Sequence, residues 1–513
     1  KQTAVGSQAL VVATTGDENT GIGYGALASL TSGSNNTAVG SNALVQSTAS
    51  NNTAVGKDAL LLNTTGASNV AVGADALDAN TTGDQNVGVG KNAIGANTTG
   101  SSNTSLGHGS LAANTTANNN TAVGYHSLVA NTTGGDNTAL GKGALESNTT
   151  ASNNVAVGFG CADANTTGTN LTGIGTNALT NNTTGSNNTA CGISALQENT
   201  TGTENVAVGA LSSDSLTTGS LNTAVGYHSL GSATTAHSCV AVGNLALFST
   251  TTGENNAAVG LNALALNTTG TNNTALGRDA LKNNTTASGN VAVGAFALDA
   301  CTTAAPNEAI GVNALGACTT GHFNSAIGNG CLGNVTTGLR NCGIGINSGQ
   351  NITTGSTNTC IGIDAGQTLQ TGSNNTFLGF GAGIGASTSQ ANEIILGNSS
   401  IGALRCQVQT ISSLSDRRDK KDIEDLTIGL DFINTLKPRK FTWQMRSPSA
   451  NDGKTQTGFI AQELQESVGE NKYLNLVDNY NDETLHAAMG NLMPIVIKAI
   501  QELSAKVTAL EAG

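Results

Sequence analysis

The segment from Asn51 to Ser68 reads NNTAVGKDALLLNTTGAS, and close copies of it fill most of the chain. Its central glycine, Gly56, has an equivalent in every copy. There are 24 of these glycines from Gly6 to Gly397, spaced 17 residues apart except at two steps that differ by one residue. A short, fixed period of this kind is typical of a solenoid, in which each repeat forms one coil.

Each repeat contains one short apolar run and one set of turn residues. The run Thr53-Ala54-Val55 before Gly56 suits a pleated strand. We expect the Asn63–Gly66 segment (Asn-Thr-Thr-Gly) to supply the positive-φ positions of tight turns. The unit is too short for a helical hairpin, so we predict a mainly β fold, a parallel β-solenoid of 17-residue coils. Stacking places like residues above like, so asparagine and threonine are expected to form ladders.

Composition separates residues 1–400 from the remainder. The 513 residues include 67 glycines, only 3% aromatic and 10% charged residues, whereas globular proteins carry roughly 25% charged residues. Residues 1–400 hold 25 charged residues and 401–513 hold 28, so we expect a domain boundary near 400. The net charge of −13 and the lack of a basic run argue against nucleic acid as a partner. No apolar run is long enough to predict membrane insertion.

The coils are too thin to bury a large core alone, so we expect neighbours along the axis and chains side by side. The repeat resembles the head repeats of trimeric autotransporter adhesins, which carry a similar Asn-Ser/Thr-(Val/Ala)-Ala-(Ile/Val)-Gly box. The resemblance implies a trimeric, left-handed parallel β-roll over residues 1–400. The present unit is slightly longer. The C-terminal membrane anchor of those adhesins is not recognisable, which argues against a bacterial surface autotransporter.

Four ordered motifs follow residue 414. They are SDRRDKKDI at 415–423, LKPRKFTW at 436–443, GFIAQEL at 458–464 and a helix expected over about 485–510. This order resembles the intramolecular chaperone domain of endosialidase tailspikes and many phage fibres. Members of that family trimerise their passenger and then cut themselves off before the serine of a Ser-Asp-x-x-x-Lys motif. The resemblance implies cleavage between Leu414 and Ser415, with Ser415 as nucleophile and Lys420 as general base.

The proposed dyad is chemically sensible. A serine hydroxyl is a weak nucleophile and needs an adjacent base, and a lysine serves when its pKa is lowered. Arg417, Arg418 and Lys421 surround Lys420 in sequence with positive charge, which acts in that direction. Asp416 also matches the motif, where it either orients Ser415 or caps a turn.

Two other residues near the motifs have simpler interpretations. Glu463 is expected to begin a solvated helix face rather than to act in catalysis. Trp443 is expected to belong to the core, as are Phe459, Ile460 and Leu464.

The C-terminal helix has a heptad seam. Its apolar residues are spaced by alternate steps of four and three, which is the pattern of a coiled coil. Pro494 is expected to mark the start of the long helix. The seam does not set the number of strands, and both resemblances imply three. The seam residues are Met489, Met493, Val496, Ile500, Leu503, Val507 and Leu510.

The nine cysteines follow no metal-binding spacing, and no metal site or cofactor is predicted. Most replace small residues of the repeat and are expected to be buried free thiols. A disulfide between Cys301 and Cys318, which occupy the same place in adjacent repeats, stays open as an alternative.

Together these observations predict three regions: a β-roll over 1–400, a connector over 401–414, and a small α+β chaperone domain over 415–513 that ends in a coiled coil. The expected function is that of a homotrimeric phage-like tail fibre or spike. It would be made in the host cytoplasm, incorporated in the virion, and bind a host cell-surface receptor, either glycan or protein, through an exterior of Thr, Asn, Ser and Gly. The only enzymatic act expected is a single-turnover self-cleavage, with no external substrate. Alternatives are a bacterial surface adhesin with a chaperone tail and a polysaccharide-degrading tailspike.

Overall fold

A computed structural model describes residues 1–401, 415–444, 453–481 and 484–513. The contacts within the chain divide it into two units, Lys1–Thr337 and Gly338–Gly513. Each unit is described separately below.

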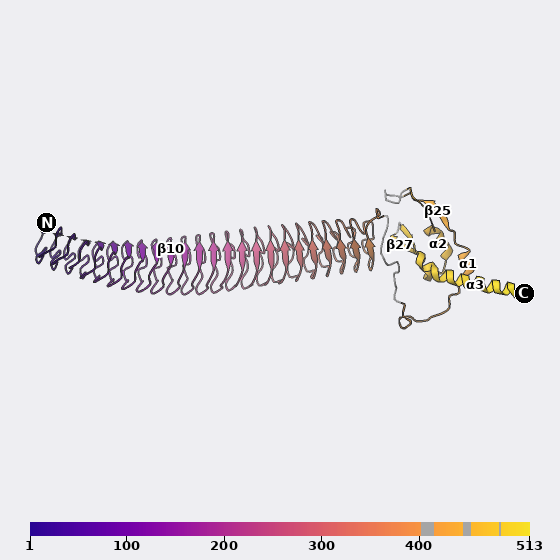
Figure 1. The fold of residues 1–513 in the computed structure, drawn as a ribbon, viewed down its shortest axis with the longest axis horizontal. Coiled ribbons are helices and arrows are strands. Elements are labelled where there is room, and N and C mark those ends of the chain that lie inside the picture. The colour runs from indigo at the N-terminus through magenta and orange to yellow at the C-terminus, as the bar shows by residue number, and fades with distance from the viewer. Residues whose placement is uncertain (402–414, 445–452, 482–483) are drawn as a thin grey trace. The chain divides into compact units, whose positions relative to one another are not determined.

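The first unit is a stack of coils, each carrying one three-residue strand (Figure 1). The strands are β1 (Thr3–Val5), β2 (Thr20–Ile22), β3 (Thr37–Val39), β4 (Thr53–Val55), β5 (Val70–Val72), β6 (Val87–Val89), β7 (Thr104–Leu106), β8 (Thr121–Val123), β9 (Thr138–Leu140), β10 (Val155–Val157), β11 (Thr172–Ile174), β12 (Thr189–Cys191), β13 (Val206–Val208), β14 (Thr223–Val225), β15 (Val240–Val242), β16 (Ala257–Val259), β17 (Thr274–Leu276), β18 (Val291–Val293), β19 (Glu308–Ile310) and β20 (Ser325–Ile327).

Successive strands pair in parallel and in register. Thr53 of β4 lies beside Val70 of β5, and Val55 lies beside Val72. Backbone hydrogen bonds extend this ladder past the strand, for example from the Gly73 amide to the Val55 carbonyl at 2.8 Å. The prediction of a mainly β, parallel solenoid with 17-residue coils is therefore confirmed.

The positive-φ residues do not lie where we expected them. In the coil of β4, Gly56 (φ 141°), Asp58 (φ 58°) and Leu60 (φ 52°) adopt positive φ, whereas Gly66 of the Asn-Thr-Thr-Gly turn does not. Gly66 is instead required by close packing, because a Cβ there would lie 2.5 Å from Asn63 Oδ1. The prediction that Asn-Thr-Thr-Gly supplies the positive-φ positions is therefore wrong for its glycine. Glycine is required there because a side chain would not fit, and not because of the backbone angle.

A buried leucine in the left-handed region recurs in most coils. Leu60 is fully buried, and its amide donates to the carbonyl of Ala76 in the next coil at 3.0 Å. The left-handed conformation costs a non-glycine residue roughly 1–2 kcal/mol, while burying a leucine contributes about 1.5–3 kcal/mol. Burial therefore outweighs the backbone cost, and the turn directs the leucine into the coil.

Asparagines form two ladders inside the stack. In the first ladder, Asn120 Oδ1 accepts from the backbone amide of Asn137 at 3.0 Å, and Asn120 Nδ2 donates to the Gly134 carbonyl at 2.9 Å. Asn131 Nδ2 donates to Asn114 Oδ1 at 3.1 Å in the second ladder. These side chains are fully buried, so the expected ladders exist but lie in the interior rather than on the exterior.

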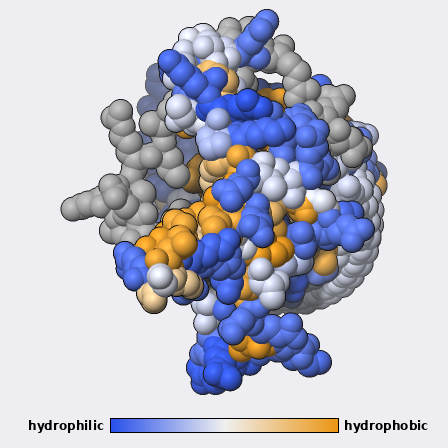
Figure 2. Space-filling view, turned by 90° about the vertical axis from the view of Figure 1, so that its right-hand side faces the viewer, coloured by the Kyte–Doolittle hydropathy of each residue, from blue (hydrophilic) through white to orange (hydrophobic). Residues whose placement is uncertain are grey.

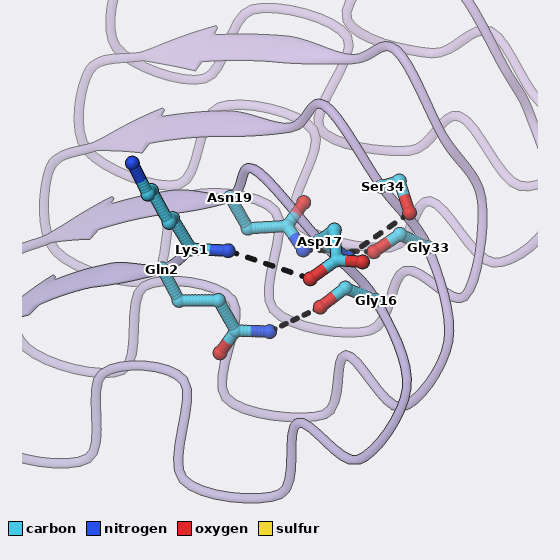
Figure 3. Close-up of polar contacts among 7 residues, drawn as sticks. All are labelled: Lys1, Gln2, Gly16, Asp17, Asn19, Gly33 and Ser34. Carbon is cyan, nitrogen blue, oxygen red and sulfur yellow. Dashed lines mark hydrogen bonds and ion pairs between the residues drawn. The ribbon is translucent and has the colours of Figure 1, made fainter.

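The first coils show how such an interior bond is made (Figure 3). Asn19 Nδ2 donates to the Gly33 carbonyl at 2.8 Å, and Gln2 makes the equivalent bond to the Gly16 carbonyl from the coil before it. Asp17 lies at the outside of the same turn, where its amide donates to Ser34 Oγ at 3.1 Å. Interior amides thus close each turn against the next, while exposed side chains link the turns from outside.

The second unit has four more solenoid strands, followed by shorter elements. Neighbours among the four pair in parallel and in register. The elements are β21 (Cys342–Ile344), β22 (Thr359–Ile361), β23 (Thr376–Leu378), β24 (Ile394–Leu396), η1 (Arg417–Asp419), α1 (Leu430–Ile433), β25 (Arg439–Thr442), β26 (Thr455–Gly458), α2 (Ala461–Val468), η2 (Lys472–Leu474), β27 (Val477–Asn481), β28 (Thr484–Ala487), η3 (Met489–Leu492) and α3 (Met493–Glu511).

The small C-terminal part has an apolar core. α3 packs against α1, and Glu502 Oε2 of α3 accepts from the Leu430 amide at 2.7 Å, which caps the first turn of α1. The residues before α3 correct one prediction. Residues 485–492 form the end of β28 and η3 rather than α-helix, and Pro494 lies in the first turn of α3, where its missing N–H costs nothing. The buried core residues are Phe432, Val468, Leu474, Leu476, Leu492 and Ile495.

The described cysteines, including Cys301 and Cys318, have free thiols, and most are buried. Burial raises the pKa of the Cys318 thiol to about 12. Cys406 lies outside the described residues. Over the described part of the chain, none of the helices has the length and apolar character needed to cross a bilayer.

Candidate active site

Ser415 and Lys420 contact each other. Lys420 Nζ donates to Ser415 Oγ at 2.6 Å, across five residues of chain. Five extended residues would span about 17 Å, so the chain must turn back on itself for this contact to form. The structure therefore brings together the two residues for which the sequence predicts catalytic roles.

The turn is built by η1 and its cap. Asp416, in an extended conformation, caps η1 by accepting from the Arg418 amide at 2.9 Å. At the other end, the Lys420 amide donates to the Arg417 carbonyl at 3.2 Å. The single turn from 416 to 420 therefore reverses the chain and directs Lys420 toward Ser415.

The Asp416 carboxylate also holds the Arg418 side chain. Asp416 Oδ2 accepts from Arg418 Nη2 at 2.6 Å, and Arg418 Nε lies 3.1 Å from both carboxylate oxygens. The Arg418 guanidinium holds the pKa of the Asp416 carboxyl below its usual range. Of the two roles open to Asp416, capping the turn is the one made by its hydrogen bonds among the described residues.

The surrounding cations are arranged differently from the sequence expectation. Arg418 is bound by Asp416, and Lys421 Nζ lies 4.0 Å from Asp422 Oδ2, so two of the three cations expected to act on Lys420 have acidic neighbours. Residues 417–422 are all exposed in the single chain. Water therefore reaches the pair from several sides.

The pair is suited to one kind of chemistry. A neutral lysine amine at hydrogen-bond distance can take the proton of a serine hydroxyl and so generate a nucleophilic oxygen. Leu414, whose carbonyl would be attacked, and the rest of the connector at 402–414 lie outside the described residues.

Two further residues singled out in the sequence lie away from this pair. Glu463 forms a double hydrogen bond with Arg439, at 2.6 and 2.9 Å, and this ion pair lowers the pKa of its carboxyl. Trp443 was expected in the core, but 36% of its surface is exposed and its indole N–H donates to Gln456 Oε1 at 2.9 Å. It packs edge-on against Phe441 at the end of the β25–β26 hairpin.

Sequence reasoning missed Arg418 as a structural partner. It was counted only as one positive charge near Lys420. The available signal was its spacing, two residues after an aspartate that begins a turn, because an N-cap carboxylate reaches the amide and the side chain at that distance.

The comparisons with known proteins agree with the position of this site. Residues 415–472 match the family model described as chaperone of endosialidase, and the match begins at Ser415. Neither the curated proteins nor the solved structures give a match to this chain. The chain thus carries a chaperone-of-endosialidase domain after a parallel β-solenoid, a combination that fits a tailspike-like or fibre-like protein.

Proposed function

We propose that this chain is a subunit of a homotrimeric, phage-type tail fibre or spike that attaches to a host cell surface. Its C-terminal domain assembles the trimer and then cuts the chain between Leu414 and Ser415. The observation that carries the proposal is the 2.6 Å contact between Lys420 Nζ and Ser415 Oγ at the first residue of the chaperone match.

The outer face of the solenoid sheet supports association between copies. The residue before each repeat glycine points outward, yet it is aliphatic in 19 of 20 coils of the first unit and a cysteine in the other. Leu106, Leu140 and Leu276 are 47–49% exposed in the single chain. A position that faced only water would not remain aliphatic over so many coils. This column contains Val5, Ile22, Val39, Val55, Val72, Val89, Leu106, Val123, Leu140, Val157, Ile174, Cys191, Val208, Val225, Val242, Val259, Leu276, Val293, Ile310 and Ile327.

A second copy of the same chain fits this column better than an unrelated partner. Each copy repeats its aliphatic residue once per coil, so two or three copies in register bury the column over its full length. The sheet face also carries few charges, which suits burial at an interface. The contact would be made along many coils, and this explains why a chaperone that sets the register is needed.

Helix α3 provides a second apolar surface. Ile495 and Ala499 face the domain core, whereas Ile500, Leu503 and Val507 of the heptad seam are 44–57% exposed. The seam continues into an apolar groove lined by residues that include Met489, Met493 and Phe459. Figure 2, viewed from the side of the C-terminal domain, shows apolar side chains gathered on this surface. Three α3 helices packed along their seams would cover it.

The cleavage step balances without a cofactor. Neutral Lys420 takes the proton of Ser415 Oγ, and this oxygen attacks the carbonyl carbon of Leu414. The Leu414–Ser415 amide bond breaks, an ester forms between Leu414 and Ser415 Oγ, and the freed amino group of Ser415 takes up a proton. Water then hydrolyses the ester, which leaves a carboxylate at Leu414 and restores the hydroxyl of Ser415.

Denaturing gels of the full chain test this step. Wild type should give a body of about 414 residues and a fragment of about 99 residues, while Ser415→Ala and Lys420→Gln should stay intact. Lys421→Gln is the matched control and should cleave like wild type, because Lys421 makes no contact with Ser415 among the described residues. Intact wild type, or cleavage of Ser415→Ala, would exclude the proposed dyad.

Sedimentation of uncleaved Ser415→Ala tests the trimer. In that background, Leu503→Asp should reduce the trimer fraction strongly, because it places three carboxylates in an apolar seam. Ser504→Asp adds the same charge beside the seam and should leave the trimer intact. A monomeric Ser415→Ala protein would contradict the assembly proposal.

Host attachment needs a separate measurement. The mature body should be detected by mass spectrometry in purified virus particles from infected cultures, and the purified body should block adsorption of those particles to cells. Particles without the body, or adsorption unaffected by an excess of it, would argue for a bacterial adhesin instead.

A further inference from the structure

The side chains that shape the turn between Ser415 and Lys420 form a compact set. One carboxylate, that of Asp416, accepts hydrogen bonds from the main chain and the guanidinium of Arg418. The Asp419 amide donates to the Asp416 carbonyl at 3.2 Å, so both the backbone and the side chain of Asp416 belong to the same turn. No other side chain is needed to close this turn among the described residues of the segment.

The dyad contact is made within a short stretch of chain, from Ser415 to Lys420. Ser415 and Lys420 are both exposed, and the hydrogen bonds that they make among the described residues join them to each other and Lys420 to Arg417. Their approach to 2.6 Å therefore depends on the local backbone path from Asp416 to Lys420. A lysine side chain with four rotatable bonds would otherwise sample many positions away from Ser415.

We propose that Asp416 and Arg418 are positioning residues for self-cleavage. Asp416 caps η1, Arg418 locks the Asp416 carboxylate in the capping orientation, and the capped turn holds Lys420 Nζ against Ser415 Oγ. Neither residue touches the reacting atoms. This inference rests on the proposed self-cleavage and assigns to that reaction two side chains which act only through the turn.

The charges around the turn fit this role. The ion pair between Asp416 and Arg418, together with the Asp416 cap, is called the clamp below. The two charges of the pair compensate each other, so the clamp adds no net charge beside Lys420. The other charged side chains of the segment are those of Arg417, Asp419, Lys421 and Asp422, and all of them are exposed. Asp416→Ala and Asp416→Asn change the charge beside Lys420 equally, so a difference between these two variants reports on the hydrogen bonds of the turn.

The rate of cleavage in the full chain separates the two parts of the clamp. Asp416→Ala removes both the cap and the ion pair, and we expect about tenfold slower cleavage, within the range found for lost N-caps. Asp416→Asn keeps an oxygen that accepts from the Arg418 amide, and should restore the rate to within about threefold of wild type. Arg418→Gln should also slow cleavage by about threefold, because the cap is kept and only its lock is lost.

Two further readouts distinguish positioning from other roles. Asp416→Ala and Asp416→Asn remove the same negative charge, so these two variants should show the same pH dependence of the cleavage rate and differ only in its magnitude. They should also keep the wild-type trimer fraction, which rules out loss of assembly as the cause. Different pH profiles for Asp416→Ala and Asp416→Asn, or equal cleavage rates for the two, would overturn the inference.

The failure of this inference differs from failure of the proposed function. If wild type does not cleave, the self-cleavage proposal itself is wrong. If wild type and Lys421→Gln cleave, Ser415→Ala does not, and Asp416→Ala cleaves at the wild-type rate, then the dyad stands and the positioning role is excluded.

Discussion

In the solenoid, most coils enclose alanines, usually one leucine and, in many coils, two asparagines, whereas the core of the C-terminal domain consists of apolar side chains such as Phe432, Leu476 and Ile495. The solenoid interior is closed by hydrogen bonds that repeat from coil to coil. The domain interior is filled by side-chain volume from elements far apart in sequence. A substitution in the solenoid should therefore destabilise it through a steric clash or a lost hydrogen bond, and the effect should extend to the neighbouring coils. A substitution in the core of the domain should destabilise it by leaving a cavity.

The largest effect is expected from a repeat glycine. Gly311 has φ +139°, and a Cβ there would collide with the Gly328 carbonyl of the next coil. Gly311→Ala should cost about 4 kcal/mol or more, because backbone strain and a backbone clash act together. Hydrogen exchange should show lost protection in the coils on both sides.

The control for this change lies five residues later. Gly316 is outside the left-handed region, and its Cβ would lie 3.4 Å from the nearest atoms. Alanine already occupies the equivalent place at Ala28 and Ala112. Gly316→Ala should leave protection unchanged, and equal effects of the two variants would refute the steric explanation.

A cavity in the C-terminal domain should have the next largest effect. Ile495 is 1% exposed, and Ile495→Ala should destabilise the domain by about 3 kcal/mol. Trp443 is the single tryptophan of the chain, so its fluorescence during urea unfolding reports on this domain alone. Ile423, which is 59% exposed, provides the control: Ile423→Ala should cost less than about 0.5 kcal/mol. Equal losses would mean that the core assignment is wrong.

A buried ladder asparagine should rank third. The run Asn118-Asn119-Asn120 has two exposed members and one buried member. Asn120→Ala would leave the buried amide of Asn137 without its acceptor, at a cost of about 2 kcal/mol. Asn118→Ala also removes an acceptor, from the Ser101 amide, but there water can replace it. Exchange protection near Asn137 should fall only in the first variant, and a loss in both would place the ladder at the surface.

The solenoid could be predicted because its information is periodic. The spacing of Gly56 and its equivalents determines which residues stack, and the register of β4 on β5 follows directly. The interior was harder to predict, since Asn52 and Asn63 are of a type usually found in exposed turns. Only the coil shows that each amide meets a carbonyl of its own turn or the next. The left-handed backbone of Leu60 could not be predicted for a similar reason, because a leucine tolerates this conformation only when its burial in the folded coil offsets the cost.

The C-terminal domain could be predicted from motifs rather than from a period, and the details were less reliable. The motif predicts Ser415 and Lys420 as a pair, and the structure places them in contact, but their catalytic role stays a prediction. Asp416 had two open roles because a carboxylate at that position reaches either a serine or a turn amide. Trp443 was assigned to the core by its residue type, although nothing in its sequence neighbourhood shows which elements would cover it.

The smallest effect is expected from a carboxylate set against the solenoid surface. Partial burial raises the pKa of Asp78, and Asp163, Asp214 and Asp299, at the same place in other coils, have pKa values raised for the same reason. Because the folded pKa lies above the unfolded one, the folded state binds the proton more tightly. The stability of the folded state should therefore fall as pH rises from the unfolded pKa to the folded pKa of these aspartates, and it should stay lower at neutral pH.

Asp78→Asn removes this penalty, because the amide has nearly the same shape as the carboxyl group but cannot ionise. The variant should unfold at a slightly higher temperature than wild type at pH 7, and at the same temperature at pH 3, where the aspartate of the wild type is protonated in both states. Asp84 is exposed, so Asp84→Asn should give no such gain at pH 7. A gain for Asp78→Asn that persisted at pH 3 would point to a better hydrogen bond rather than to relieved desolvation. In that case hydrogen bonding would determine the stability at this outer position of the coil, as it does in the coil interior.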